Sequence, residues 1–420
     1  MRNYNIYKKD RGIYIAEAAV EYLISIPVTG SFLAKLTVQL GFSDSLTGII
    51  TAFLSLGCAF QVACAFIPKG DSKKKKCISF ALINEILFTL LYAVPLVPLS
   101  PALKTVIFVL MILTAQIFMN IINPVKIDWY MAMVDDAKRG VFTANKEIVS
   151  LISGTVFSLL LGTTADRFEA AGNPKGYFIC CAVAMFTLSV THCLLYAFTT
   201  EEKEINQENT GFFKEFTSIS KNKKYISAII ICAVWNIAVH ISTPFYGTYQ
   251  IRELGFSMTR VSVYTFIYSG VRVIFSRFWG RFADKSGFLK MTGVCVLCAA
   301  VGFGINMFTV PSNGKVFYLI YYCLYAIASA GINSALINLV FDAVEQNHRR
   351  IGIAVQKAIY GILGFLSTLC VSPVISLIQK NGDVIFGMHI YAQQVTSIAA
   401  FAVSVCLAVY IFCVSGRQAE

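Results

Sequence analysis

Long apolar runs, most of them more than twenty residues long, alternate with short polar segments along the whole chain. A helix needs about 20 residues to cross roughly 30 Å of hydrocarbon, so each run can span a bilayer. The runs lack the strict alternation of apolar and polar residues that is typical of outer-membrane barrels. The pattern predicts twelve transmembrane helices, over residues 13–38, 44–67, 77–98, 103–127, 142–165, 176–199, 225–249, 258–280, 289–310, 316–341, 351–378 and 392–414.

The composition supports a membrane protein and argues against other classes. Apolar residues make up 56% of the 420-residue chain and charged residues 14%, whereas soluble domains carry about 25% charged residues. This deficit excludes a soluble enzyme and a disordered regulator, and it argues against a nucleic-acid partner despite the net charge of +12. Cys295 and Cys298 form a CxxC pair inside a span without a second pair, so we expect no metal site.

Lysine and arginine are unevenly distributed between the loops on the two sides of the predicted helices. They gather in the segment before the first span and in every second loop after it, as in the run from Lys73 to Lys76. Cytoplasmic loops carry such an excess of basic residues. The distribution predicts that both termini are cytoplasmic in a multi-pass protein of the plasma (cytoplasmic or inner) membrane.

The two halves of the chain resemble each other on either side of a polar segment, residues 200–224. We predict a six-helix half over 1–199, a cytoplasmic linker over 200–224 and a second six-helix half over 225–420. Three pairs of segments match in the same order and at nearly the same offset: AAVEYL (18–23) with CAVWNI (232–237), LGFSDS (40–45) with LGFSMT (254–259), and KRGVFTANK (138–146) with RRIGIAVQK (349–357). Two such halves are parallel repeats related by an axis along the membrane normal.

A loop motif adds to this topology. The segment GRFADKSG, residues 280–287, lies between the predicted eighth and ninth spans and follows Arg277. With its duplicated twelve-span pattern, the chain resembles the major facilitator superfamily of secondary transporters. The resemblance implies an all-α integral membrane fold of two pseudo-symmetric six-helix bundles.

The same resemblance implies that the loop motif holds one gating state. Asp284 would lie near the positive N-terminus of the helix that begins near Arg139, and Gly280 would allow a close approach. The candidate gating residues are Gly280, Arg281, Asp284, Arg139 and Arg350. The alternative is a solvated loop that only follows the charge rule.

Polar side chains recur at helical spacing in spans 1, 4, 7 and 10, which the resemblance places around a central cavity. The candidate substrate-binding residues are Ser25, Thr29, Gln116, Asn120, Asn236, His240, Thr243, Ser329 and Asn333. The alternative is hydrogen bonding between helices that only holds the bundle together. Pro27 with Gly30, and Pro244 with Gly247, predict broken helices whose backbone could face a ligand, or else simple packing kinks.

Charged residues inside the predicted spans are candidates for ion coupling. Glu21 lies on the polar stripe of span 1 and Glu85 lies in the middle of span 3, so both are coupling candidates; each could instead be a buried, partnered acid. Lys126 would pair with Asp128 or reach the interface, and we expect His192 to be structural.

These features favour a secondary active transporter of a small polar solute, either a sugar or an organic anion, working by alternating access. A proton or sodium gradient would supply the energy, because the chain has no nucleotide-binding GxxxxGK[ST] loop and implies no cofactor. The expected partners are the solute and the lipid bilayer, and we expect a monomer.

One alternative is an efflux antiporter for drugs or metabolites, which the same fold allows. It is disfavoured because span 4 lacks the arginine found in many proton-coupled members of the family, and span 5 lacks the glycine–proline pattern that is typical of drug/proton antiporters. These two departures also leave the specific coupling mechanism open. A second alternative is a polytopic membrane enzyme. We expect no enzyme, because the four histidines lie on separate elements.

Overall fold

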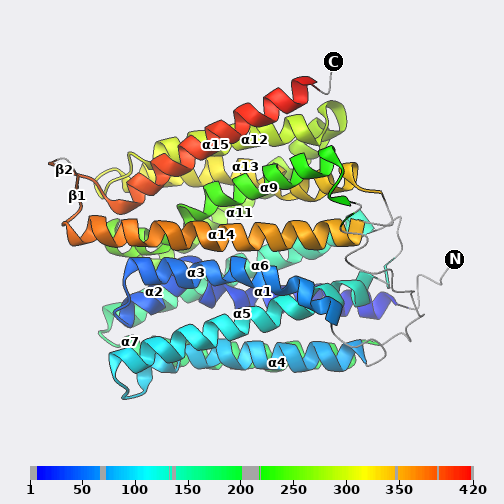
Figure 1. The fold of residues 1–420 in the computed structure, drawn as a ribbon. Helices are drawn as coiled ribbons and strands as arrows, with labels where there is room; N and C mark the ends of the chain where they lie inside the picture. The colour runs from blue at the N-terminus through cyan, green and yellow to red at the C-terminus, as the bar shows by residue number, and fades with distance from the viewer. Residues whose placement is uncertain are drawn as a thin grey trace. The chain divides into compact units, whose positions relative to one another are not determined.

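The computed structural model describes residues 7–66, 72–131, 133–134, 139–200, 217, 219–345, 349–385 and 387–417, and these form an almost entirely helical protein (Figure 1). The first half forms α1 (Lys8–Ser25), η1 (Ile26–Val28), α2 (Gly30–Gln39), α3 (Asp44–Ala59), η2 (Phe60–Phe66), α4 (Lys73–Leu91), η3 (Val94–Leu96), α5 (Pro101–Met131), α6 (Arg139–Ala170) and α7 (Pro174–Phe198). The second half forms α9 (Lys223–His240), η5 (Thr243–Phe245), α10 (Tyr246–Thr248), η6 (Tyr249–Glu253), α11 (Met258–Ser286), α12 (Phe288–Asn306), α13 (Gly314–Ala343), α14 (Arg349–Lys380) and α15 (Ala392–Arg417).

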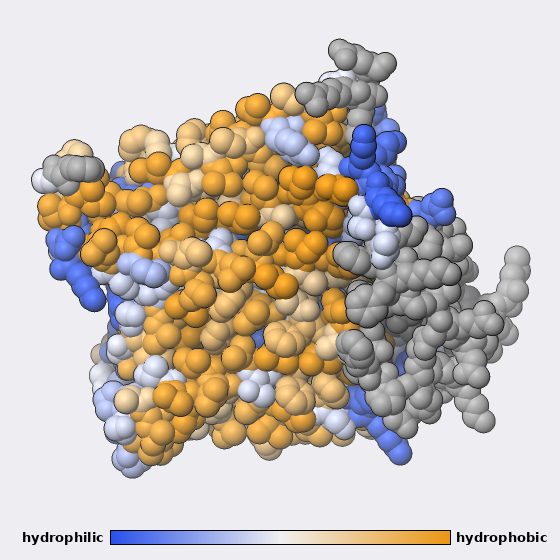
Figure 2. Space-filling view, viewed as in Figure 1, coloured by the Kyte–Doolittle hydropathy of each residue, from blue (hydrophilic) through white to orange (hydrophobic). Residues whose placement is uncertain are grey.

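Helices cover all twelve predicted spans, which confirms the predicted architecture. Within the part of the chain that the structure describes, eleven helical segments are long and apolar enough to cross a membrane. The exception is α11, which has 29 residues but carries Arg260, Arg272, Arg277 and Arg281. The middle parts of the helices display mainly apolar side chains, and hydrophilic side chains gather near the helix ends (Figure 2). This distribution fits contact with lipid along the helices.

Both predicted helix breaks are present. The first span divides at Pro27 into α1 and α2, and Gly30 opens α2 with a φ of +53°. The seventh span divides after His240, continues through η5 and α10, and ends in a π-helical turn, η6. Neighbouring side chains satisfy carbonyls at both breaks: the Tyr92 hydroxyl donates to Pro27 O at 2.7 Å, and the Thr368 hydroxyl donates to His240 O at 2.8 Å. These two carbonyls therefore support the packing alternative.

The contacts divide the chain into two compact units. Unit 1 comprises Met1–Phe42, Phe60–Gln207 and Ser257–Val263, and unit 2 comprises Ser43–Ala59, Glu208–Phe256 and Tyr264–Glu420. This grouping differs from the predicted sequence halves at two places: α3 belongs to unit 2, and the first residues of α11 belong to unit 1.

An aspartate carboxylate attaches each of these segments to its unit, and Asp44 is buried whereas Asp166 is half-buried. Asp44, at the start of α3 and fully buried, accepts from Arg252 at 2.6 Å, Gln379 at 2.9 Å and Gln393 at 3.1 Å within unit 2. In unit 1, Asp166 of α6 accepts from the backbone N–H groups of residues 258 and 259, both at 2.8 Å. Asp166 thereby caps the start of α11.

Small residues allow the close helix packing that the sequence suggests. In unit 2, a Cβ at Gly361 of α14 would lie 2.4 Å from the backbone oxygen of Ser55 in α3. In unit 1, a Cβ at Gly162 of α6 would lie 2.7 Å from the backbone oxygen of Met258. Helices α14 and α15 are joined by a short antiparallel hairpin that the sequence pattern did not predict, with β1 (Val384–Ile385) paired to β2 (Met388–His389).

Replacing Gly361 with alanine should destabilise the protein by about 1–3 kcal/mol, because the added methyl group meets backbone that cannot turn aside. The measurement is equilibrium unfolding in detergent micelles. Gly270→Ala in α11 is the matched control, since a Cβ there meets nothing within 4 Å. Equal stability of the two variants would contradict the close approach of α3 and α14.

Candidate functional site

A cluster of charged side chains lies inside unit 1, where α1, α4, α5 and α7 meet. We call Glu17, Glu21, Glu85, Lys126 and His192 the buried charge cluster. Helix α4 packs against α5 and α7, and α1 packs against α7, so four helices supply the five side chains (Figure 1). Charged groups at this depth need partners, because the membrane interior does not solvate them.

Glu17 is the centre of the cluster and has no exposed surface. Its Oε1 accepts from the Tyr196 hydroxyl at 2.8 Å, lies 2.9 Å from His192 Nε2 and lies 3.4 Å from Lys126 Nζ. Its Oε2 is buried without a hydrogen-bond partner among the described residues. Glu17 is one turn before Glu21 on α1, so the i, i+4 spacing places both carboxylates on one face.

His192 bridges two acids. Its Nδ1 contacts Glu85 Oε1 and its Nε2 contacts Glu17 Oε1. A neutral imidazole carries one N–H, so two such hydrogen bonds need a second proton, either on the imidazole or on one of the carboxyl groups. The three groups therefore share at least two protons in this arrangement.

Lys126 joins the cluster to a small cavity. Its ammonium pairs with Glu21, whose side chain is 29% exposed, while the lysine side chain is 5% exposed. Glu21, Glu85, Lys126 and His192 all line this cavity of about 20 Å³, which is room for one water molecule. Water can thus reach the cluster from the Glu21 side.

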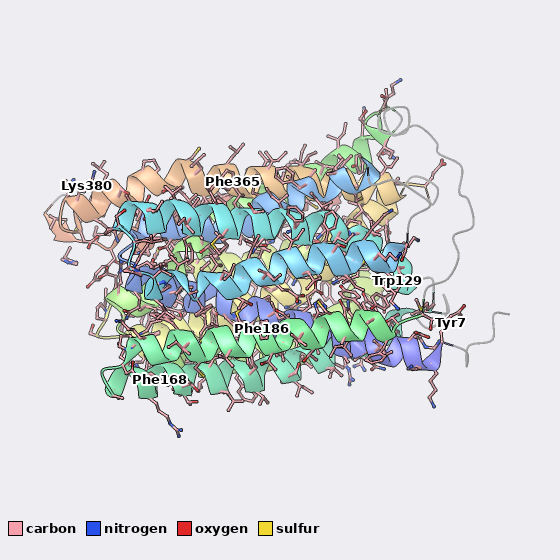
Figure 3. All side chains as sticks on the ribbon, turned by 90° about the horizontal axis from the view of Figure 1, so that it is seen from below. Tyr7, Trp129, Phe168, Phe186, Phe365 and Lys380 are labelled. Carbon is pink, nitrogen blue, oxygen red and sulfur yellow. The ribbon has the colours of Figure 1, made fainter. Side chains whose placement is uncertain are left out.

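Aromatic rings pack against the cluster. The rings of Tyr14 and Tyr130 stack with centroids 4.0 Å apart, and Trp129 stacks on Tyr130 at 4.7 Å. The three side chains are at most 2% exposed. Trp129 lies near the end of α5, and Tyr7 just before α1 packs against the same group of rings (Figure 3). These rings exclude water and so strengthen electrostatic interactions beside them.

The predicted binding residues of unit 1 mostly bond within their own helices. The hydroxyls of Ser25 and Thr29 donate to backbone oxygens of α1, at 2.7 and 2.9 Å. Asn120 donates to Gln116 O at 2.9 Å and accepts from Gln61 at 3.0 Å. Only the buried Oε1 of Gln116 lacks a partner among the described residues.

The predicted binding residues of unit 2 show a similar pattern. Asn236 is fully buried, and its amide nitrogen donates to Tyr360 O, while its Oδ1 has no partner among the described residues. His240 Nδ1 lies 3.1 Å from Asn236 O, and the Thr243 hydroxyl donates to the backbone of α9 at 3.0 Å. Ser329 is buried and Asn333 is exposed on α13. The structure therefore describes these residues in two separate groups, one in each unit.

An aromatic group in unit 2 was not singled out from the sequence. Tyr268 of α11 lies 5.1 Å from the Tyr322 ring and 6.3 Å from the Tyr325 ring, and Trp235 stacks near Tyr325 at 6.5 Å. Tyr268, Tyr322 and Tyr325 are half-buried. The sequence does contain a signal for this aromatic group, because tyrosines recur at helical spacing in the YLIYYCLY segment of span 10.

The predicted gating loop is exposed. Gly280, Arg281 and Asp284 are solvent-exposed, and a Cβ at Gly280 would meet nothing within 4 Å. The contact expected between this loop and the helix that begins near Arg139 joins the two units, and it stays a prediction. The side chains of Arg139 and Arg350 lie outside the described residues.

The structure changes the interpretation of three residues. Glu17 was not among the candidates, His192 was expected to be structural, and Lys126 was expected to pair with Asp128 or reach the interface. All three contact the coupling candidates Glu21 and Glu85 or each other. The side chain of Asp128 lies outside the described residues. No group of His, Cys, Asp and Glu that could hold a metal ion is found in the described ranges.

Replacing Lys126 with methionine should destabilise the protein by about 3–5 kcal/mol, because it leaves buried carboxylates without a cation. Adding Glu21→Gln to that variant should restore part of the loss, and Lys126→Arg, which keeps the charge, is the control. The measurement is equilibrium unfolding of the variants in detergent micelles. Additive effects of Lys126→Met and Glu21→Gln would show that the two side chains do not interact.

Comparisons with known proteins agree with this architecture. The family model of the Major Facilitator Superfamily matches residues 16–368. No curated protein matches the chain.

Solved structures match over nearly the whole chain. A variant of the nucleoside transporter NupG is 15% identical with a TM-score of 0.73, and the match covers 96% of this chain and 99% of that one. A bacterial homologue of the human lysosomal transporter Spinster, inward-facing and unoccupied, is 14% identical with a TM-score of 0.73, covering 99% and 98%. A D-xylose–proton symporter is 14% identical with a TM-score of 0.72, covering 95% and 96%. The family model matches far more than half of the chain, and the chain therefore belongs to the Major Facilitator Superfamily.

Proposed function

We propose that this protein is a secondary active transporter that moves a small polar solute by alternating access and couples the movement to a proton gradient. The family and the helical membrane architecture support transport. The single observation that carries proton coupling is the imidazole of His192 held between the carboxyl groups of Glu17 and Glu85.

The charge count of the cluster favours proton binding. With Lys126 and His192 both protonated, three carboxylates face two cations, so the cluster carries one net negative charge. Binding one more proton makes it neutral. A change of one charge in a buried site shifts the balance between conformations that solvate the site differently.

The contacts also favour a proton over sodium as the coupling ion. The Oε1 atoms of Glu17 and Glu85 already face nitrogen atoms, and the carboxylate of Glu21 is occupied by the Lys126 ammonium. A sodium ion needs several oxygen ligands at once and would have to compete with these donors, whereas a proton needs only one carboxylate oxygen, such as the unpartnered Oε2 of Glu17 or Glu85. Lys126 lies within reach of both Glu17 and Glu21, so protonation of either acid would change its pairing.

The aromatic group of unit 2 supports a neutral hydroxylated solute. Half-buried tyrosine rings offer both an apolar face and a hydroxyl, which suits sugar or nucleoside rings. Among the similar structures are a nucleoside transporter and a D-xylose–proton symporter. An organic anion is the second candidate, because Lys357 lies half-buried with its ammonium 6.0 Å from the Tyr360 ring centroid.

Glu85→Gln should abolish accumulation driven by a pH gradient while leaving solute exchange intact, because glutamine can still hydrogen-bond to His192 but cannot carry a proton. The measurement is uptake of labelled xylose, uridine and a dicarboxylate into proteoliposomes, under an inward proton gradient and in counterflow. We expect a loss of at least about tenfold in driven uptake. The control is Glu169→Gln, an exposed acid paired with Lys35 in the same unit.

Three outcomes would contradict parts of this proposal. Accumulation that a sodium gradient drives and that pH does not affect would show that sodium, and not the proton, is the coupling ion. Gradient-driven uptake that persists in the Glu85→Gln variant would show that the cluster does not couple proton movement to solute movement. Export of lipophilic compounds in place of uptake of polar solutes would support the efflux antiporter instead.

A further inference from the structure

The two acids that hold His192 differ in their access to water. Glu85, His192 and Tyr196 all line the small cavity of unit 1, and Glu17 is not among the described residues that line it. Glu17 also has no exposed surface. A water molecule in this cavity can therefore exchange a proton directly with Glu85 but not with Glu17.

The two acids also differ in the groups that face their Oε1 atoms. Glu17 Oε1 accepts from the Tyr196 hydroxyl at 2.8 Å and lies 2.9 Å from His192 Nε2. The ammonium of Lys126 lies 3.4 Å from the same oxygen. Hydrogen-bond donors and a nearby cation stabilise the charged form of a carboxyl group. These three contacts therefore favour an ionised Glu17.

Glu85 has fewer donors. Its Oε1 faces His192 Nδ1, and its Oε2 is buried without a hydrogen-bond partner among the described residues. The Ser189 hydroxyl is close to Glu85, but it donates to Met185 O at 2.9 Å, so its hydrogen is already used. Glu17 Oε2 is unpartnered as well, and the difference between the two acids thus arises at the Oε1 atoms.

Packing holds the Tyr196 hydroxyl against Glu17. Tyr196 is 2% exposed, and its ring centroid lies 4.7 Å from that of His192 and 6.3 Å from that of Trp129. Tyr196 follows His192 by one turn of α7, so the i, i+4 spacing places both donors on the same face of the helix. A phenol carries a single hydrogen, and its donation to Glu17 leaves none for Glu85.

Other titratable or charged groups surround the two acids. From the helices packed around the cluster they are Tyr14 and Glu21 of α1, Cys77 of α4, Lys126 and Tyr130 of α5, Lys146 of α6 and Cys193 of α7. The lysines are already cations, and tyrosine and cysteine are neutral near pH 7. The Glu21 carboxylate is paired with the ammonium of Lys126. Glu85 is therefore the acid that is best placed to gain a proton.

We propose that Tyr196 is a positioning residue: by holding Glu17 in its ionised form, it leaves Glu85 as the carboxyl group that binds the coupled proton. In this step an O–H bond of a protonated water in the cavity breaks, an O–H bond forms at Glu85 Oε2, and a neutral water remains. Ionised Glu17 stays between His192 and Lys126 as their counter-charge. This inference rests on the proposed function, and it adds which acid carries the proton and what determines that choice.

The test is pH-difference infrared spectroscopy of the full-length protein in lipid vesicles, which records the carbonyl stretch of a protonated carboxyl group. The pH is lowered from about 8 to about 6, above the range in which exposed carboxyl groups titrate. We expect one such band in the wild-type protein and its loss in Glu85→Gln. Should Glu85→Gln fail to fold, Glu85→Asp keeps a carboxyl group at the site and should shift the band.

Tyr196→Phe keeps the ring and removes the donor to Glu17. The proton should then be divided between Glu17 and Glu85, so we expect a second carbonyl band. The matched control is Tyr130→Phe, because the Tyr130 hydroxyl belongs to the same group of rings but faces the Thr199 hydroxyl at 3.4 Å. This variant should keep the single band. A merely structural role of Tyr196 would lower the unfolding temperature without adding a band.

The outcomes separate this inference from the proposed function. Proton-driven uptake by the wild-type protein, together with a band that persists unchanged in the Glu85 variants, would overturn the inference and leave the proposed function standing. A band that depends on Glu85 in a protein without proton-driven uptake would refute the proposed function instead. A single unchanged band in Tyr196→Phe, a second band in Tyr130→Phe, or no titrating band in the wild-type protein would each overturn the inference.

Discussion

Ionised groups inside a membrane are stable only when other groups replace the water that they lose, and unit 1 is arranged around this constraint. Lys126 is nearly buried and is held between Glu17 and Glu21, while His192 is held between Glu17 and Glu85. These contacts form only when the four helices are correctly rotated and positioned along their axes relative to one another. The cluster therefore links the packing of unit 1 to its protonation state.

Such a cluster suits a transporter better than a static scaffold. Two hydrophobic side chains of similar volume would stabilise a helix interface at least as well as a buried ion pair. Here the unpartnered Oε2 atoms of Glu17 and Glu85 leave acceptors available for a further proton among the described residues. The neighbouring cavity has room for the water that would deliver it.

Backbone polar groups obey the same constraint. At both helix breaks, tyrosine and threonine hydroxyls satisfy the carbonyls that the prolines and turns would leave without partners. The carboxylates of Asp44 and Asp166 likewise accept hydrogen bonds at the two segments that belong to the unit of the other sequence half, α3 and the start of α11. Each carboxylate holds a segment from one sequence half against helices of the other half, inside a single compact unit.

The sequence by itself determined the spans, the two helix breaks and the faces that carry polar residues, because hydropathy and helical period are local properties. The i, i+4 spacing that puts Glu17 and Glu21 on one face of α1 is also a local property, although Glu17 was not among the candidates. It could not determine that His192 lies between Glu17 and Glu85, or that Lys126 pairs with Glu21, because these residues are far apart in the chain. Only the rotation and packing of α1, α4, α5 and α7 against one another bring them together. For the same reason, only the tertiary structure decided that Gly361 packs against α3.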